Sequence, residues 1–259
     1  MTIPATEAVP SATLLGVRVH LITMRRAVEV IRQMLHGDVP RRILTAHTAM
    51  LARVHAAPDL LEVVNSADLT TPDGFGILLV GRILGLRFPE RVAGADLAEA
   101  LCALCAREHL RVFLLGAKPG VAEAAAAALI RRYPGLHVAG TQHGYFTGDE
   151  EPAVLARIRV ARPHLLLVAM GFPPQDQWIA RHRHSLNVPV CMGVGGTLDV
   201  MAGMFRRAPA WVQRAGLEWL YRAVQEPRRW RVAASIPGVI LLAVRERLGG
   251  RTRLRRSRG

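Results

Sequence analysis

The chain has 259 residues, of which 51% are hydrophobic and 21% are charged, and its formal net charge is +14. This length is enough to bury one large core or two small ones. No run approaches the roughly 18 apolar residues that a membrane-spanning helix requires, and residues 1–16 carry no basic segment ahead of an apolar one. We therefore expect a cytoplasmic protein without a transmembrane helix or a secretory signal.

From about residue 41 to residue 203, apolar, β-branched runs alternate with helical patterns. The expected strands are residues 41–46, 67–71, 111–116, 137–146, 164–171 and 188–196. The expected helices are residues 50–57, 77–85, 121–133, 151–161, 177–184 and 197–203. This alternation, with strands that are apolar almost throughout, predicts an α/β fold: a Rossmann-like, mostly parallel sheet with helices on both faces.

The pattern changes after Ala208, where no convincing strand follows. We expect helices broken at Pro227 and Pro237 and then an Arg-rich tail. Residues 201–259 contain fourteen arginines and three acids, a net charge of +11, against +3 for residues 1–200. We predict two units: an α/β body over residues 1–205 and a helical, basic appendage over residues 206–259.

The appendage permits three interpretations, because basic and aromatic residues alternate within it. They are Arg222, Arg228, Arg229 and Arg231 with Trp219, Tyr221 and Trp230. The set suits a solvated basic face, a nucleic-acid surface, or an anionic membrane surface. The apolar stretch 236–244 beside these arginines suits the membrane interface.

The three cysteines and the acidic residues give no sign of a metal site. Cys102 and Cys105 share one face of an expected helix, but no second pair stands at zinc-binding spacing. No Asp-x-Asp pair or His/carboxylate cluster is visible either. We interpret the cysteines as buried apolar residues in a reducing compartment and expect no metal ligands.

The segment TTPDGFG, residues 70–76, places one acid between a proline and a glycine at a strand-to-helix turn. Asp73 is a good candidate for the N-cap of the helix that follows. Ligands of open α/β sheets also bind at the carboxyl ends of strands, which makes Asp73 a candidate for chemistry. On this segment alone capping is the more economical interpretation.

Other strand ends carry further candidates. Residues 193–196, GVGG, bring glycine N–H groups toward a possible ligand, and Asp199 follows as a cap or as an acceptor for a ribose or a base. Gln175, in GFPPQDQW, is a hydrogen-bonding candidate or a solvated loop residue. Thr45 and His47 close the first strong strand and are either ligand contacts or structural residues.

The loop GAKPG, residues 116–120, joins an expected strand to an expected helix. It fits a phosphate contact or a plain glycine turn. It is not G-x-G-x-x-G, and no acid stands about 20 residues later to bind a ribose. A nicotinamide-dependent dehydrogenase is therefore disfavoured.

Taken together, these segments resemble the WecG/TagA/CpsF family of bacterial glycosyltransferases (glycosyltransferase family 26). The matching pieces occur in the family's order between about Thr45 and Arg231. They are PDGFG, ERVAGADL, FLLGAKPGVAEAA, GFPPQDQW, GVGGTLDVMAG, RRAPAWVQRAGLEWLYR and EPRR.

The resemblance implies an inverting hexosyltransferase that needs neither a metal nor another cofactor. Members move N-acetylmannosamine, or its uronic acid, from a UDP-sugar to a polyprenyl-diphosphate-linked N-acetylglucosamine. The reaction belongs to cell-surface polysaccharide synthesis and takes place on the cytoplasmic face of the membrane. The expected partners are therefore the UDP-sugar, the lipid-linked acceptor and an anionic membrane surface, and not nucleic acid.

The resemblance also implies roles for individual residues. Asp73 matches the family's proposed general base, which favours chemistry over capping, and Thr45 and Gln175 match residues near it. The other positions in the expected substrate site are His47, Arg91, Gly193, Gly195, Gly196, Asp199 for the nucleotide, and Arg222 and Arg229 for the diphosphate.

The chain departs from the family pattern at three places. His47 stands where the family usually has Asn, and Asp176 where it usually has Glu. Beyond Arg229 the usual spacing of arginines is not kept, since Trp230, Arg231 and Val232 follow. The change at His47 leaves open another sugar, such as glucosyl transfer onto lipid-linked glucose in exopolysaccharide assembly. Two other classes also remain as alternatives: a nonenzymatic nucleic-acid-binding protein and a nucleotide-cofactor oxidoreductase.

Overall fold

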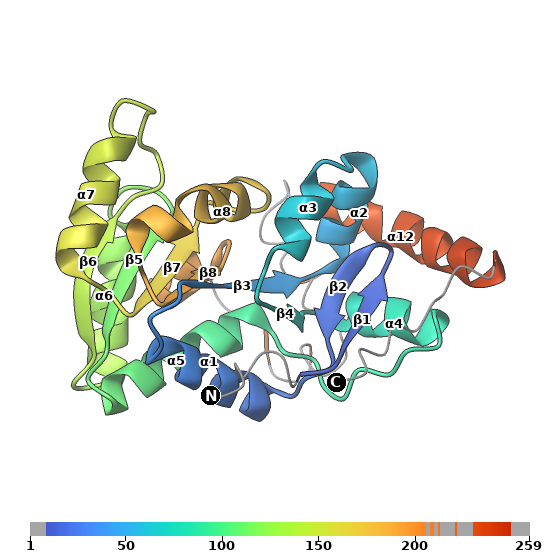
Figure 1. Cartoon of the computed structure of the whole chain (residues 1–259), viewed down its shortest axis with the longest axis horizontal. Helices are drawn as coiled ribbons and strands as arrows, with labels where there is room; N and C mark the ends of the chain where they lie inside the picture. Colours follow the sequence, from blue (N-terminus) through green and yellow to red (C-terminus); the bar gives the residue numbers. More distant parts are fainter. Residues whose placement is uncertain (1–8, 206–207, 210–211, 213–220, 222–229, 250–259) are drawn as a thin grey trace.

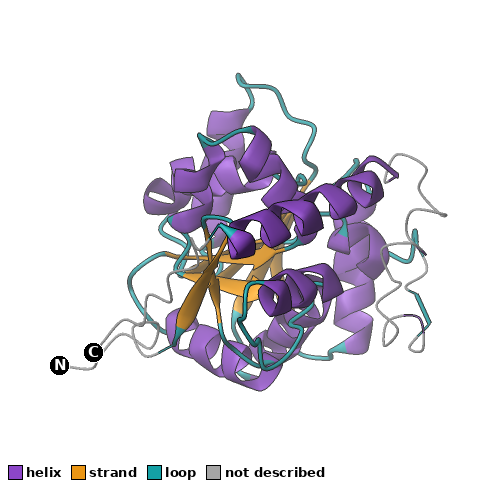
Figure 2. Ribbon diagram, turned by 90° about the vertical axis from the view of Figure 1, so that its right-hand side faces the viewer, coloured by secondary structure: helices purple, strands orange, loops and turns teal. Residues whose placement is uncertain are grey.

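The computed structural model describes residues 9–205, 208–209, 212, 221 and 230–249. Its centre is a six-stranded parallel sheet in the order β4-β3-β8-β7-β5-β6, enclosed by helices (Figures 1 and 2). The strands are β3 (Arg41–Ala46), β4 (Leu69–Pro72), β5 (Arg111–Gly116), β6 (His137–Gln142), β7 (Leu165–Ala169) and β8 (Val190–Gly193). The predicted α/β class and parallel sheet are confirmed.

The alternation of side chains along each strand divides the interior into two layers. In β7, Leu165 and Leu167 face one layer, while Leu166 and Val168 face the other. The first layer is covered by α1 (Met24–Leu35), α5 (Gly94–Arg107), α6 (Val121–Arg132) and α9 (Thr197–Met201). The second is covered by α7 (Glu151–Ala161) and α8 (Pro174–Leu186).

The cysteines lie in these layers. Cys102, Cys105 and Cys191 are free and buried, as predicted. Burial raises the pKa of Cys105 and of Cys191 to about 12, so both remain thiols at neutral pH.

A third cluster lies beneath the β3–β4 edge. It packs α2 (Thr48–Ala56), α3 (Leu60–Asn65) and α4 (Phe75–Ile83) against an antiparallel hairpin, β1 (Ser11–Leu14) and β2 (Val17–His20). The hairpin was not predicted from the sequence. Its two-residue turn has positive φ at both Leu15 (49°) and Gly16 (85°), and leucine gives no sequence signal for that conformation.

Helix α12 (Trp230–Leu248) packs on this cluster beside α2 and α4 (Figure 1). Its Val239 and Ala243, four residues apart, are buried there. The predicted break at Pro237 is wrong, because α12 continues through this residue. Burial of the next turns offsets the one backbone hydrogen bond that proline removes. The predicted boundary between residues 205 and 206 stays a prediction, because residues 206 and 207 lie outside the described part of the chain.

Within the described residues, no helix is both long enough and apolar enough to cross a membrane.

The packing of α12 can be tested with Val239→Asp. An unpaired carboxylate at this buried site costs several kcal/mol, so we expect local opening of residues 230–248 to increase at least 100-fold. Amide hydrogen exchange of that segment measures the effect. The control is Leu241→Asp on the same helix, where the side chain is 51% exposed. Equal exchange in the two variants would show that Val239 does not hold the helix.

Candidate active site

The carboxyl ends of β3, β4, β7 and β8 open into one cleft of about 1010 Å³. Helices α2 and α4 contribute to its walls, and Ile236 of α12 reaches it. Seven of the residues expected from the sequence line this cleft: Thr45, His47, Asp73, Gln175, Gly193, Gly195 and Gly196. Parallel strands bring them together because their carboxyl ends lie at the same edge of the sheet.

Asp73 and Thr45 converge at the start of α5. Asp73 follows β4, and its N–H donates to Ala46 O at the end of β3 (2.8 Å). The Asp73 carboxylate accepts a hydrogen bond from the N–H of Gly94, the first residue of α5 (3.1 Å). A Cβ added at Gly94 would stand 3.1 Å from Thr45 Oγ1 and 3.2 Å from Asp73 Oδ2. Both side chains therefore lie close to the first residue of α5, at the positive end of its dipole.

This arrangement answers the question of capping. The N-cap residue of α4 is Gly74, which has no side chain with which to cap the helix. Asp73 is therefore not the N-cap residue of the helix that follows it. Its carboxylate instead contacts a helix that begins 21 residues later, and this contact keeps it at the cleft.

Gln175 joins two loops at the opposite wall. Its Oε1 accepts from Gly171 N–H (3.1 Å) after β7 and from Gly195 N–H (2.9 Å) after β8. A Cβ at Gly193 would stand 2.5 Å from Gln175 Nε2, so any larger residue there would displace the Gln175 amide. The N–H of Gly195, expected to face a ligand, is bonded to Gln175, and the side chain of Gln175 is buried and not a solvated loop residue.

His47 begins α2 and borders the cleft. Its Nδ1 accepts from Met50 N–H (3.3 Å), which makes it the N-cap. Its ring packs edge-on against Phe172, with centroids 6.3 Å apart. Histidine thus keeps the capping bond that an Asn would make and adds an aromatic ring to the cleft.

The remaining expected residues lie elsewhere. Arg91 stacks over the ring of Phe75, a lining residue, with 5.4 Å from Cζ to the centroid, but does not itself line the cleft. Asp199 is in the first turn of α9 and is not a lining residue either. Arg222 and Arg229 lie outside the described residues. The loop 116–120 does not border the cleft.

Comparisons with known proteins show the family of this chain. Residues 12–253 match the model of the glycosyl transferase WecG/TagA/CpsF family. The chain belongs to this family. It is a glycosyltransferase, and the resemblance inferred from the sequence is confirmed.

Two relatives illustrate the match. A Staphylococcus aureus (strain MW2) protein is 34% identical over 239 residues, which is 92% of this chain and 93% of the relative. A Bacillus subtilis (strain 168) protein is 34% identical over 194 residues, 75% of each chain. Both are named N-acetylglucosaminyldiphosphoundecaprenol N-acetyl-beta-D-mannosaminyltransferase.

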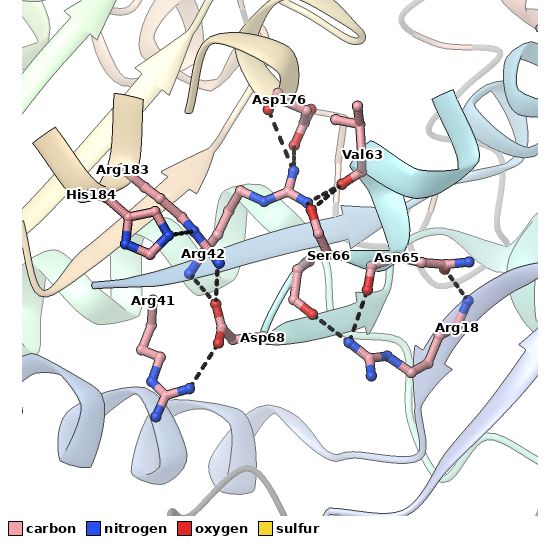
Figure 3. A network of polar contacts seen from close by, with 11 residues as sticks. Arg18, Arg41, Arg42, Val63, Asn65, Ser66, Asp68, Asp176, Arg183 and His184 are labelled. Atoms are coloured by element: carbon pink, nitrogen blue, oxygen red, sulfur yellow. Dashed lines mark hydrogen bonds and ion pairs between the residues drawn. The ribbon is translucent and has the colours of Figure 1, made fainter. Parts of the chain in front are cut away.

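In this glycosyltransferase, the residue that follows Gln175 belongs to a buried ionic network (Figure 3). Its neighbour Asp176 lies 3.5 Å from the guanidinium of Arg42 on β3, and both side chains are almost fully buried. Arg42 also donates to Val63 O and to Ser66 Oγ at the end of α3. The start of α8 is thereby fastened to β3 and α3.

Two further cleft residues were missed from the sequence. Arg53 on α2 and Arg82 on α4 both line the cleft, and both are exposed. Each lies past the strand-end motif, on a helix, where an arginine looks like any solvated residue. Only the packing of α2 and α4 around the cleft reveals them.

In the described part of the chain, no three His, Cys, Asp or Glu side chains are grouped so as to hold a metal ion.

The bridging role of Gln175 predicts a stability effect. Gln175→Met keeps the volume but leaves two N–H groups without their acceptor, so the free energy of unfolding should fall by about 2–4 kcal/mol. Gln177→Met, on the exposed side of the same helix, should change it by less than about 0.5 kcal/mol. Urea unfolding measures both. Equal effects would contradict the bridge.

The network also predicts a pH effect. Burial raises the pKa of Asp176 to about 6 from 3.8, despite the opposing attraction of Arg42. Between these values the folded state holds a proton that the unfolded state has released. The contribution of Asp176 to stability therefore falls as the pH rises from about 4 to about 6.

Urea unfolding of the native protein and of Asp176→Asn at pH 4.5 and 7 tests this effect. The free energy of unfolding of the native protein, relative to the variant, should drop by about 2 kcal/mol between the two pH values. A constant difference would mean that Asp176 titrates as an ordinary carboxyl group.

Proposed function

We propose that this glycosyltransferase moves N-acetylmannosamine from UDP-N-acetylmannosamine to undecaprenyl-diphosphate-linked N-acetylglucosamine in cell-surface polysaccharide synthesis. The names of the Staphylococcus and Bacillus relatives support the sugar and the acceptor. The observation that carries the chemistry is the position of the Asp73 carboxylate at the cleft, where it accepts from Gly94 N–H and where Thr45 lies close to the same glycine.

Asp73 acts as the general base of a single inverting displacement. Its carboxylate takes the proton of the acceptor hydroxyl while that oxygen attacks the anomeric carbon of the donor. The bond between this carbon and the diphosphate oxygen breaks on the opposite face, and UDP leaves. Thr45 and Gln175 support this step: Thr45 lies beside the carboxylate, and Gln175 holds the loops that face it.

The departing diphosphate gains negative charge, and arginines stabilise it in place of a metal ion. Guanidinium groups suit this role because they form paired hydrogen bonds to phosphate oxygens. Arg53 and Arg82 already line the cleft. Arg222 and Arg229 of the appendage add to them, and Asp199 binds the nucleotide near the glycines of residues 193–196.

His47 contributes to the choice of donor sugar, and Arg91 supports the cleft through its contact with Phe75. The His47 ring takes the place of the family's smaller amide beside Phe172, which changes the shape of the cleft at that point. The donor assay therefore includes UDP-glucose beside UDP-N-acetylmannosamine and its uronic acid.

The protein works as a peripheral protein on the cytoplasmic face of the cell membrane, where its lipid-linked acceptor is anchored. The excess of +11 in residues 201–259 favours an anionic leaflet, since each basic residue near such a surface adds about 1 kcal/mol of binding. The body of residues 1–205 carries the chemistry, and the appendage of residues 206–259 completes the site at the membrane.

The first test is acceptor-dependent UDP release by the native protein and by Asp73→Asn. Loss of the base should lower kcat by about 10²- to 10⁴-fold. The donor panel identifies the sugar, and a parallel reaction with EDTA tests the independence from metal.

Asp149→Asn is the matched control, because Asp149 is exposed in a loop outside the cleft. It should retain native activity. Equal release by the native protein and Asp73→Asn would exclude the proposed base, and no release with any donor would exclude the proposed reaction.

A further inference from the structure

A second cavity, of about 610 Å³, lies beside the catalytic cleft and shares Leu78 and Arg82 with it. Its other lining residues are Gly85, Leu86, Arg87 and Phe88, in the loop that follows α4. Helix α12 reaches the same place: a Cβ added at Gly85 would stand 3.1 Å from Arg247 Nη1. Two arginines, Arg82 and Arg87, therefore line the cavity, and a third, Arg247, lies against one of its lining residues, Gly85.

These arginines have no acidic counterpart in the described part of the chain. Arg82, Arg87 and Arg247 are exposed, and no described Asp or Glu forms an ion pair with any of them. Glu90, close in sequence, accepts instead from the N–H of Met24. Positive charge gathered around a hollow attracts an anion with several oxygens, such as a phosphate group.

The outer face of α12 carries a stripe of apolar side chains beside this cavity. Leu241, Val244 and Leu248 recur at intervals of three and four residues and are 51%, 37% and 82% exposed. A soluble phosphate compound has no apolar part that could cover this stripe. An exposed apolar stripe next to arginines is the arrangement of a helix that lies in a membrane interface.

We propose that the second cavity binds the phosphate headgroup of an anionic glycerophospholipid, whose acyl chains lie against the Leu241–Val244–Leu248 stripe. This inference rests on the proposed action at a membrane surface and names the lipid that holds the protein there. Ile236 and Arg247 are eleven residues apart on α12, about 16 Å along its axis. Because the headgroup site and the cleft border the same helix, the bound headgroup holds the cleft at the level of the membrane surface where the acceptor's diphosphate lies.

Vesicle co-sedimentation of the full-length protein tests the proposal. The probes are mixed phosphatidylglycerol/phosphatidylcholine vesicles and pure phosphatidylcholine vesicles. Arg87→Gln combined with Arg247→Gln should weaken binding to the anionic vesicles about tenfold or more. The control pair, Arg131→Gln with Arg159→Gln, removes the same charge from exposed positions on α6 and α7 and should weaken it less than about threefold.

Transfer to a soluble short-chain acceptor without vesicles is measured in parallel, because neither Arg87 nor Arg247 lines the catalytic cleft. Selective loss of vesicle binding with native transfer supports the site. Equal losses in both pairs, or equal binding to both kinds of vesicle, overturn it. A raised KM for the short-chain acceptor with unchanged vesicle binding also overturns it and assigns the cavity to the acceptor's diphosphate. If only the Arg87/Arg247 pair loses vesicle binding and neither the native protein nor any variant transfers the sugar, the lipid site is supported and only the proposed reaction is refuted.

Discussion

The cleft depends on one side-chain oxygen. Gln175 Oε1 accepts hydrogen bonds from the loops after β7 and β8, and this bridge fixes two of the four strand ends around the cleft. Because the side chain is buried, any displacement of α8 would leave two backbone N–H groups without an acceptor. Gly193 shows how tight the arrangement is, since a single methyl group there would collide with the amide of Gln175.

The bridge is itself supported by buried charges, which cost more to assemble than an apolar contact. Asp176 follows Gln175 directly and contacts Arg42, which bonds in turn to the end of α3 (Figure 3). Burial raises the pKa of Asp176 to about 6, so folding works against its ionisation. Such a network adds little stability, but it allows only one position for α8. The cleft needs this fixed position because loops form much of its wall.

The parallel sheet could be predicted from the sequence because its strands are apolar throughout and end in recognisable turns. The convergence of Thr45 and Asp73 followed from the same rule of strand ends. The contact of Asp73 with Gly94 could not be predicted, since it depends on how α5 packs. The cleft arginines were missed for a related reason. Arg53 and Arg82 lie at the cleft because of how α2 and α4 pack, and this packing cannot be predicted from the local sequence.

Helix α12 shows how a tertiary contact overrides a local signal and connects two parts of the molecule. Pro237 predicts a break, yet the burial of Val239 and Ala243 keeps the helix continuous across it. Continuity matters because the helix has two ends with different neighbours: Ile236 borders the catalytic cleft, and Arg247 meets the loop at Gly85. A break at Pro237 would uncouple them. With a continuous helix, the proposed binding of a lipid headgroup at the Arg247 end would also constrain the wall of the cleft at Ile236.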